Sequence, residues 1–169
     1  MVILDTGKNF ESEVRKSLKV SNCFWFRIQD TNDVSRFVKQ AISEKQPGDF
    51  FAVYKGTPFL LECKTSQRQT SFPIFYGKTK SIPDHQVEGA KEVEKHGGKA
   101  FFLIRRDEKR NKRTWALTWK QVYQMYKTKS KSVSWDWIIK KGIEVQRLSS
   151  PVRWDMEELF NKTLNRTKG

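Results

Sequence analysis

One stretch of the chain, residues 47–64, constrains the fold more than any other. Two apolar runs, at 50–54 and 59–61, are separated there by Lys-Gly-Thr-Pro at 55–58. Glycine and proline between apolar runs of this length predict a turn between two strands. The fold is therefore expected to be organised around a β-hairpin.

The open end of this hairpin carries charge that a simple hairpin does not need. Asp49 precedes the first strand, and Glu62 and Lys64 end the second. Side chains alternate across a strand, so Glu62 and Lys64 share a face. A two-residue loop at 56–57 pairs Asp49 with Lys64, and a tighter closure pairs Asp49 with Glu62. Both registers bring the three side chains together, whereas a slip by one residue would separate them.

Two carboxylates that converge beside apolar strands repel each other unless a cation lies between them. Oxygen ligands suit a hard cation such as Mg²⁺, which often keeps several waters. A neighbouring lysine can polarise an attacking water or stabilise charge on a phosphorane-like transition state. The alternative is a surface hairpin with solvated charges at its rim, but the apolar residues on both sides favour a partly buried site.

The composition indicates a polyanionic partner. The 169 residues include 33 Lys and Arg against 19 Asp and Glu, which gives a formal net charge of +14. Such an excess is typical of proteins that bind nucleic acid or an anionic membrane face. No apolar run approaches membrane-spanning length, and the N-terminus has no signal-peptide pattern, so a soluble, cytoplasmic protein is expected.

Two further cofactor classes are disfavoured by the motifs. Cys23 and Cys63 form no CxxC pair and the chain has two histidines, so both cysteines are expected to be reduced core residues and not zinc ligands. Neither GxGxxG nor GxxxxGK[ST] occurs, which argues against a nucleotide cofactor.

Apolar periodicity and turn residues predict a single α/β domain with a mixed sheet flanked by helices. Its core is expected at 7–126, followed by a C-terminal helical extension at 127–169. The expected order is a helix at 7–20, a strand at 23–28, a short helix at 34–42, the hairpin, a helix at 83–96, strands at 100–104 and 114–118, and helices at 119–126, 135–141 and 156–164, the last capped by Asp155.

Two acidic residues flank the apolar stripe of the first helix. Glu13 is expected to be solvated, where it also benefits from the positive end of the helix dipole. Glu11 adjoins Phe10 and Val14 around the helix, so its side chain could reach the edge of the core and approach the hairpin site.

The segment after the hairpin, 65–82, is a basic loop with an aromatic cluster at 71–76. Lysines there suit contacts to phosphates, and aromatic rings suit contacts to bases. The alternative, which applies to Phe72 and Ile74 in particular, is that the apolar side chains of this cluster turn back into the core.

The order of Glu11, Asp49 and Glu62-Cys63-Lys64 resembles the PD-(D/E)XK nuclease superfamily, although Gly48 separates Pro47 from Asp49. That motif is short. A longer run is more specific: residues 59–74, followed by Asp-His-Gln-Val-Glu at 84–88, resemble RecU-type Holliday junction resolvases. Residues 7–11 also resemble the helix of RecU and of archaeal Hjc resolvases. This resemblance covers most of the chain and implies a restriction-endonuclease-like fold.

The resemblance further implies roles for individual residues. Mg²⁺, with Mn²⁺ as a substitute, would be held by Asp49, Glu62 and the Cys63 carbonyl. Lys64 would activate the attacking water or stabilise charge, Glu11 would orient a water, and Gln86 would contribute from its helix. His85 is expected to make a structural hydrogen bond and not to act as a general base. The DNA contacts are expected from Arg27, Arg36, Lys39, Thr65, Arg68, Thr70, Ser71, Phe72, Lys78 and Lys80.

A resemblance of this kind implies a homodimeric, metal-dependent endodeoxyribonuclease that resolves four-way DNA junctions by paired cuts. The segment 29–46 occupies the place of the bacterial stalk but is shorter, which suits a phage-encoded enzyme acting in the host cytoplasm. Two alternatives stay open: a restriction- or repair-type endonuclease acting on linear or flap DNA, and a non-catalytic protein that binds branched DNA.

Overall fold

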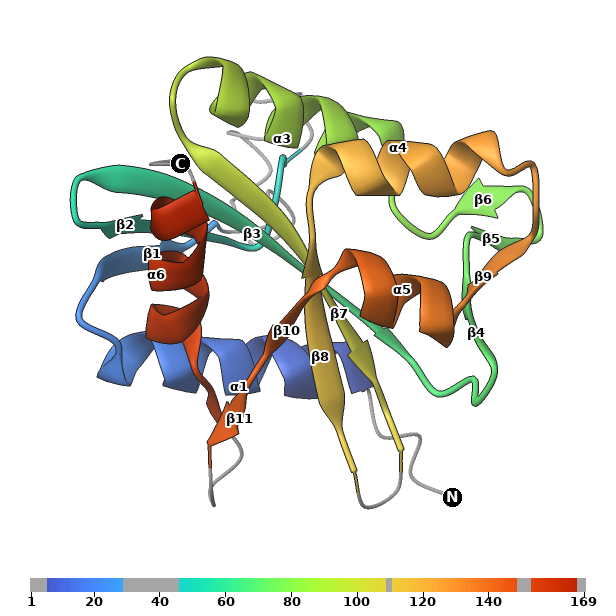
Figure 1. Cartoon of the computed structure of the whole chain (residues 1–169), viewed down its shortest axis with the longest axis horizontal. Helices are drawn as coiled ribbons and strands as arrows, with labels where there is room; N and C mark the ends of the chain where they lie inside the picture. The colour runs from blue at the N-terminus through green and yellow to red at the C-terminus, as the bar shows by residue number, and fades with distance from the viewer. Residues whose placement is uncertain (1–5, 29–45, 109–110, 149–152, 167–169) are drawn as a thin grey trace, which may run out of the picture.

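The computed structural model describes residues 6–28, 46–108, 111–148 and 153–166. A six-stranded mixed sheet forms its centre, in the order β1-β2-β3-β7-β8-β10, and β3 and β7 are its parallel pair (Figure 1). The strands are β1 Phe24–Arg27, β2 Phe50–Tyr54, β3 Thr57–Ser66, β7 Lys99–Arg106, β8 Arg113–Leu117 and β10 Ile143–Val145. The predicted mixed sheet is therefore confirmed.

The central hairpin is formed by β2 and β3 in the tighter of the two predicted registers. Tyr54 pairs with Thr57, and Phe50 pairs with Leu61. The two loop residues, Lys55 and Gly56, have φ of 48° and 77°. Positive φ at both positions is typical of the primed turns whose twist matches the strands of a hairpin. Just before β2, the Asp49 N–H donates a hydrogen bond of 2.9 Å to the Leu61 carbonyl, which places Asp49 beside the end of β3 that carries Glu62.

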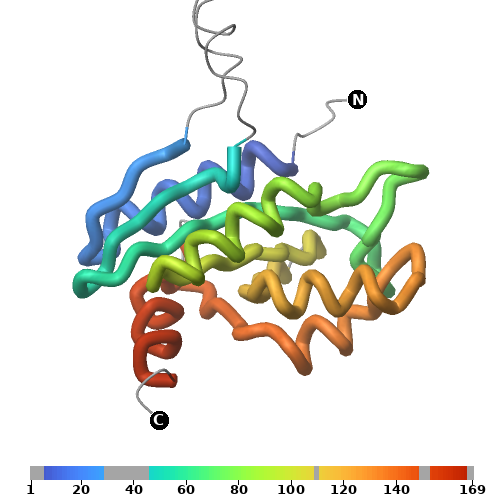
Figure 2. The backbone as a smooth tube through the Cα atoms, turned by 90° about the horizontal axis from the view of Figure 1, so that it is seen from above, coloured from blue at the N-terminus to red at the C-terminus, as the bar shows by residue number. Residues whose placement is uncertain are grey.

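Helices cover both faces of the sheet. On one face lie α1 Thr6–Val20 and α6 Met156–Arg166, and on the other lie α3 Asp84–Lys95, α4 Trp119–Lys127 and α5 Trp135–Lys141. Figure 2 shows α6 at one end of the molecule and α4 and α5 toward the other. No helix among these has the length and apolarity needed to span a bilayer.

Alternation along β3 divides the core into two clusters. Phe59 and Leu61 point toward α1 and α6, whereas Leu60 points toward α3. Glu62 and Lys64 have the parity of Leu60, so they lie on the α3 face. The described residues also form three short two-stranded pairs: β4 Ser71–Pro73 with β9 Ser132–Ser134, β5 Phe75–Tyr76 with β6 Thr79–Lys80, and β11 Arg147–Leu148 with β12 Arg153–Trp154.

The C-terminal segment contributes more than the helices predicted for it. β10 pairs with β8 and extends the central sheet by a sixth strand. The ring centroid of Phe160 in α6 lies 4.3 Å from that of Phe59. The predicted cap is confirmed, because the Asp155 carboxylate accepts a hydrogen bond of 2.9 Å from the Glu158 N–H. The C-terminal segment therefore supplies a strand of the sheet through β10 and part of the core through α6.

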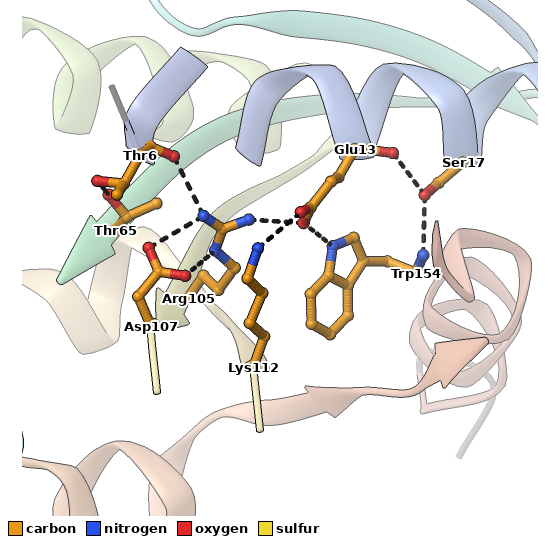
Figure 3. Close-up of polar contacts among 8 residues, drawn as sticks. All are labelled: Thr6, Glu13, Ser17, Thr65, Arg105, Asp107, Lys112 and Trp154. Atoms are coloured by element: carbon orange, nitrogen blue, oxygen red, sulfur yellow. Dashed lines mark hydrogen bonds and ion pairs between the residues drawn. The ribbon is translucent and has the colours of Figure 1, made fainter. Parts of the chain in front are cut away.

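A buried polar network joins α1 to β7 and β12, and two predictions are wrong there (Figure 3). Arg105, expected in a charged turn, lies in β7 and is 1% exposed. Glu13, expected to be solvated, binds the guanidinium of Arg105 at 2.6 Å and Lys112 at 3.2 Å, and accepts a hydrogen bond from the Trp154 indole. Arg105 also donates to the Thr6 carbonyl. The network ties the first two turns of α1 to the sheet.

Candidate active site

Four of the predicted site residues meet at the open end of the hairpin. One carboxylate oxygen of Glu62, Oε1, accepts a hydrogen bond of 2.7 Å from Gln86 Nε2 and lies 2.8 Å from Lys64 Nζ. Asp49 Oδ2 accepts a hydrogen bond of 2.7 Å from the Cys63 backbone N–H. β2, β3 and the first turn of α3 therefore position this group.

The Glu62 carboxyl is buried, and its surroundings disfavour the ionised form. It is 5% exposed, and its pKa is raised from 4.5 to about 7. Burial is the main cause, because it disfavours the charged form. The Asp49 charge raises the pKa further, and Lys64 and the Gln86 hydrogen bond oppose the shift. A second positive charge near this carboxylate would restore its ionised form.

Two buried oxygens at the site have no hydrogen-bond partner among the described residues: Glu62 Oε2 and Gln86 Oε1. A buried acceptor left in this state costs about 1–3 kcal/mol. A hydrated cation would satisfy both, through direct ligation and through its water. The residues thus fit Mg²⁺, which is usually bound through one or two carboxylates and several waters. In the described ranges no three His, Cys, Asp or Glu side chains form a complete cage.

Cys63 can contribute through its backbone only. Burial raises the pKa of its thiol well above the ordinary value, and the carboxylates of Asp49, Glu62 and Glu11 add to that shift. The thiol packs against the core cluster on the α1 face, on the opposite side of β3 from Glu62. It is therefore an inert core group, as predicted for both cysteines.

Glu11 approaches the site from α1, on the other side of the sheet. Its Oε2 lies 2.9 Å from Arg27 Nη2, and its charge is felt at Cys63. Arg27, predicted to contact DNA, has a side chain that is 55% exposed and is engaged by this ion pair. Glu11 is thus beside the site, on the side of the sheet that carries the Cys63 thiol.

Several predicted DNA contacts lie on the loop and small strands after β3. Arg68 lies over the ring of Tyr76 at 5.8 Å, and Lys80 is bound to Asp84 at 2.6 Å. Lys78 and Thr70 are exposed, and Ser71 is half-buried at the start of β4. Tyr76, which is 53% exposed, belongs to the aromatic cluster predicted to suit base contacts, although it was not among the individual residues predicted to contact DNA.

Two of the predicted DNA contacts do not fit this surface. Phe72 is 1% exposed and its ring packs on Trp135 with centroids 6.1 Å apart, so the prediction of a base contact is wrong and the core alternative holds. Thr65 bonds to Thr6 at 3.3 Å on the α1 face. Arg36, Lys39 and the predicted helix at 34–42 lie outside the described residues.

A mixed sheet with a parallel crossover through α3, helices on both faces and polar residues at the end of the β2–β3 hairpin defines the class: a nuclease-type fold like that of restriction endonucleases. The model of one family, Recombination protein U, matches residues 9–161. This chain belongs to the RecU family.

The similar proteins agree with this assignment. The chain is 44% identical over 57 residues to the Holliday junction resolvase RecU of Shouchella clausii, covering 34% of this chain and 25% of that protein. It is 35% identical over 68 residues to RecU of Bacillus pumilus, covering 40% and 31%. The alignments thus span about a quarter to a third of these relatives.

A solved structure supports the fold alone. The Archaeoglobus fulgidus Hjc, a Holliday junction resolvase from an archaeal hyperthermophile, superimposes with a TM-score of 0.51 at 14% identity. The match covers 82% of this chain and 95% of that one.

Proposed function

We propose that this protein is a metal-dependent endodeoxyribonuclease that resolves four-way DNA junctions. The observation that carries the proposal is the buried Glu62 carboxylate, with one oxygen held by Lys64 and Gln86 and the other without a partner among the described residues. It lies close to Asp49, whose charge raises the pKa of Glu62, in a chain of the RecU family. The net charge of +14 suits a DNA substrate.

Asp49 and Glu62 would hold a divalent cation, Mg²⁺ or Mn²⁺, with the Cys63 carbonyl as a further ligand. When bound, the cation would make water a better nucleophile and neutralise charge on the scissile phosphate. Lys64 would stabilise the charge that develops on the phosphate oxygens. Gln86 would fix the Glu62 carboxylate, and Glu11 would orient a water from the α1 side.

Paired cleavage of two opposed strands needs two sites related by a twofold axis, so the active form would be a homodimer. Each cut would leave a 5′-phosphate and a 3′-hydroxyl. The reaction would take place in the cytoplasm, on branched DNA formed during recombination and repair. Arg68, Tyr76 and Lys78 are the described surface residues best placed to contact an arm of the junction.

The test is a cleavage assay on a mobile four-way junction beside a linear duplex of equal length, with Mg²⁺ or with EDTA. The expected result is symmetric cutting of the junction in Mg²⁺ but not in EDTA, and little cutting of the duplex in either condition. Equal cutting of both substrates would show that the enzyme does not select the junction and would favour an endonuclease that acts on linear DNA. Tight junction binding with no cleavage in Mg²⁺ or Mn²⁺ would favour the alternative of a non-catalytic protein that binds branched DNA.

A further inference from the structure

A cavity of about 490 Å³ lies at the turn of the β2–β3 hairpin, away from its open end. The hairpin turn, the loop between α3 and β7 and the last turns of α6 enclose it, and Figure 1 shows these three segments on the same side of the molecule. Thr57 lines the cavity at the start of β3, and Glu62 lies five positions further along that strand. At ~3.3 Å per residue the cavity and the candidate active site are roughly 17 Å apart.

The lining of this cavity offers hydrogen-bond donors and positive charge. It carries two ammonium groups, one hydroxyl and two amides, from Lys55, Lys99, Thr57, Asn161 and Asn165. Among the described residues that line it there is no Asp or Glu. A concave surface with charge of one sign concentrates ions of the opposite sign. The lining therefore favours an anion.

Asn161 is held so that its amide nitrogen can donate to a ligand. Its Oδ1 accepts a hydrogen bond of 2.9 Å from Lys55 Nζ and one of 3.0 Å from the Tyr54 hydroxyl. Tyr54 is 1% exposed, so the core fixes this arrangement. Because both bonds go to the oxygen, the N–H groups of Asn161 are left without an acceptor among the described residues. Glu157 accepts a hydrogen bond from the same tyrosine and does not line the cavity.

The two lysines of the lining differ in how the chain holds them. Lys99 begins β7, is half-buried and has no carboxylate partner among the described residues. Lys55 lies in the hairpin turn with a φ of 48°, where glycine or asparagine is the usual residue. A side chain kept in such a conformation is more common at ligand-binding positions than elsewhere. Lys55 and Lys99 therefore give the cavity one anchored and one unengaged ammonium group.

The end of α3 beside the cavity does not oppose an anion strongly. The C-terminal end of a helix carries partial negative charge on its last carbonyl groups. In this helix the N–H groups of residues 96–98 donate to the carbonyls of residues 92–94 at 2.9–3.2 Å. These carbonyls are thus already hydrogen-bonded within the chain, which reduces the negative potential that α3 presents to the cavity.

We propose that this cavity binds a small phosphorylated ligand, with its phosphate group between Lys55 and Lys99. Two ammonium groups match the charge of a phosphate dianion, and the N–H groups of Asn161 and the hydroxyl of Thr57 match its oxygens. The volume of the cavity falls within the ~300–1,000 Å³ of small-molecule sites. A backbone phosphate of duplex DNA carries a single charge and lies on a wide, convex surface, which suits this concave site less well. The inference does not depend on nuclease activity.

The test is isothermal titration calorimetry of the full chain with inorganic phosphate and with adenosine monophosphate, in EDTA at constant ionic strength. Wild type should bind both in a saturable, one-to-one manner. Asn161→Asp keeps the oxygen that accepts from Lys55 and Tyr54 but replaces the N–H donors by a negative oxygen, so the dissociation constant should rise about tenfold or more. Lys99→Gln should weaken binding to a similar degree. Lys140→Gln, an exposed position on α5, is the control with the same change in net charge and should bind like wild type.

No saturable binding by wild type would overturn the proposal, and so would an equal loss of affinity in Lys140→Gln. If Lys99→Gln weakens the binding of duplex DNA but not that of phosphate or adenosine monophosphate, the cavity contacts DNA and the proposal is wrong. Thermal unfolding of each variant checks the fold, and if Asn161→Asp is destabilised, Lys99→Gln decides the question alone. A wild type that binds phosphate here yet cuts no DNA would refute the proposed function and leave this site standing.

Discussion

Replacing Glu62 by glutamine is expected to stabilise the metal-free protein at alkaline pH. The pKa of Glu62 is raised from 4.5 to about 7, so the folded protein binds more protons than the unfolded chain between these values. The contribution of Glu62 to stability is therefore most favourable below pH 4.5 and is lost as the pH rises through 7. A shift of about 2.5 units corresponds to roughly 3 kcal/mol at 1.36 kcal/mol per unit.

Glutamine mimics the protonated carboxyl, so the Glu62→Gln protein lacks this loss. At pH 8 in EDTA it should be more stable than wild type by up to about 3 kcal/mol, which is ~6–12 °C in Tm for a chain of this size. At pH 4.5 the two proteins should be similar. The loss of the Lys64 ion pair is already contained in the shift, because Lys64 is one of its causes.

The assay is urea and thermal unfolding at several pH values from 4.5 to 8, in EDTA and in Mg²⁺. Glu88→Gln is the matched control, because the Glu88 side chain is 64% exposed on the same helix as Gln86. The control should stay within about 0.5 kcal/mol of wild type. Mg²⁺ should stabilise wild type but not Glu62→Gln. If Glu62→Gln instead destabilises the protein equally at every pH, Glu62 is a structural anchor and the reasoning is wrong.

Three further predictions concern other parts of the chain. Arg105→Ala removes one of the cations that bind Glu13 and should lower the free energy of unfolding, measured in urea, by about 3–5 kcal/mol. A decrease of less than 1 kcal/mol would show that the network is not buried in solution. Asp155→Ala removes the N-cap of α6 and should cost about 1 kcal/mol; no change would mean that the cap bond is not formed. The double variant Arg68→Ala/Lys78→Ala should weaken junction binding and lower the slope of the log binding constant against log salt concentration by about 1–2. An unchanged slope would show that other residues contact the phosphates.

The centre of the site was predictable because strand parity has a period of two. Any hairpin register in which the numbers of two paired residues add up to an odd number brings Asp49, Glu62 and Lys64 to one face. Their meeting therefore depended only on where the turn falls. The choice between registers did not follow from the sequence, since Lys55 adopts a positive φ that its type rarely takes. Gln86 was placed only by resemblance, because the rotation of α3 over the sheet is set by long-range packing.

The errors share a cause: charged or aromatic residues that look exposed locally find distant partners. Arg105 sits in a run of charges, yet it is buried because Glu13 and Asp107 satisfy it from both sides. Phe72 lies in a polar loop, but Trp135 from the C-terminal segment covers it. The contacts of Arg105 with Glu13 and of Phe72 with Trp135 span 60 residues or more and leave no periodic signal.

The central claim is most directly tested by separating cleavage from binding in Asp49→Asn and Glu62→Gln. Single-turnover cleavage of a mobile four-way junction in Mg²⁺ is measured beside junction binding in EDTA. Both variants should bind within a few-fold of wild type and cleave about 10³-fold more slowly, a loss of ~4 kcal/mol of transition-state stabilisation. Cleavage by either variant within tenfold of wild type would contradict the assignment of the site.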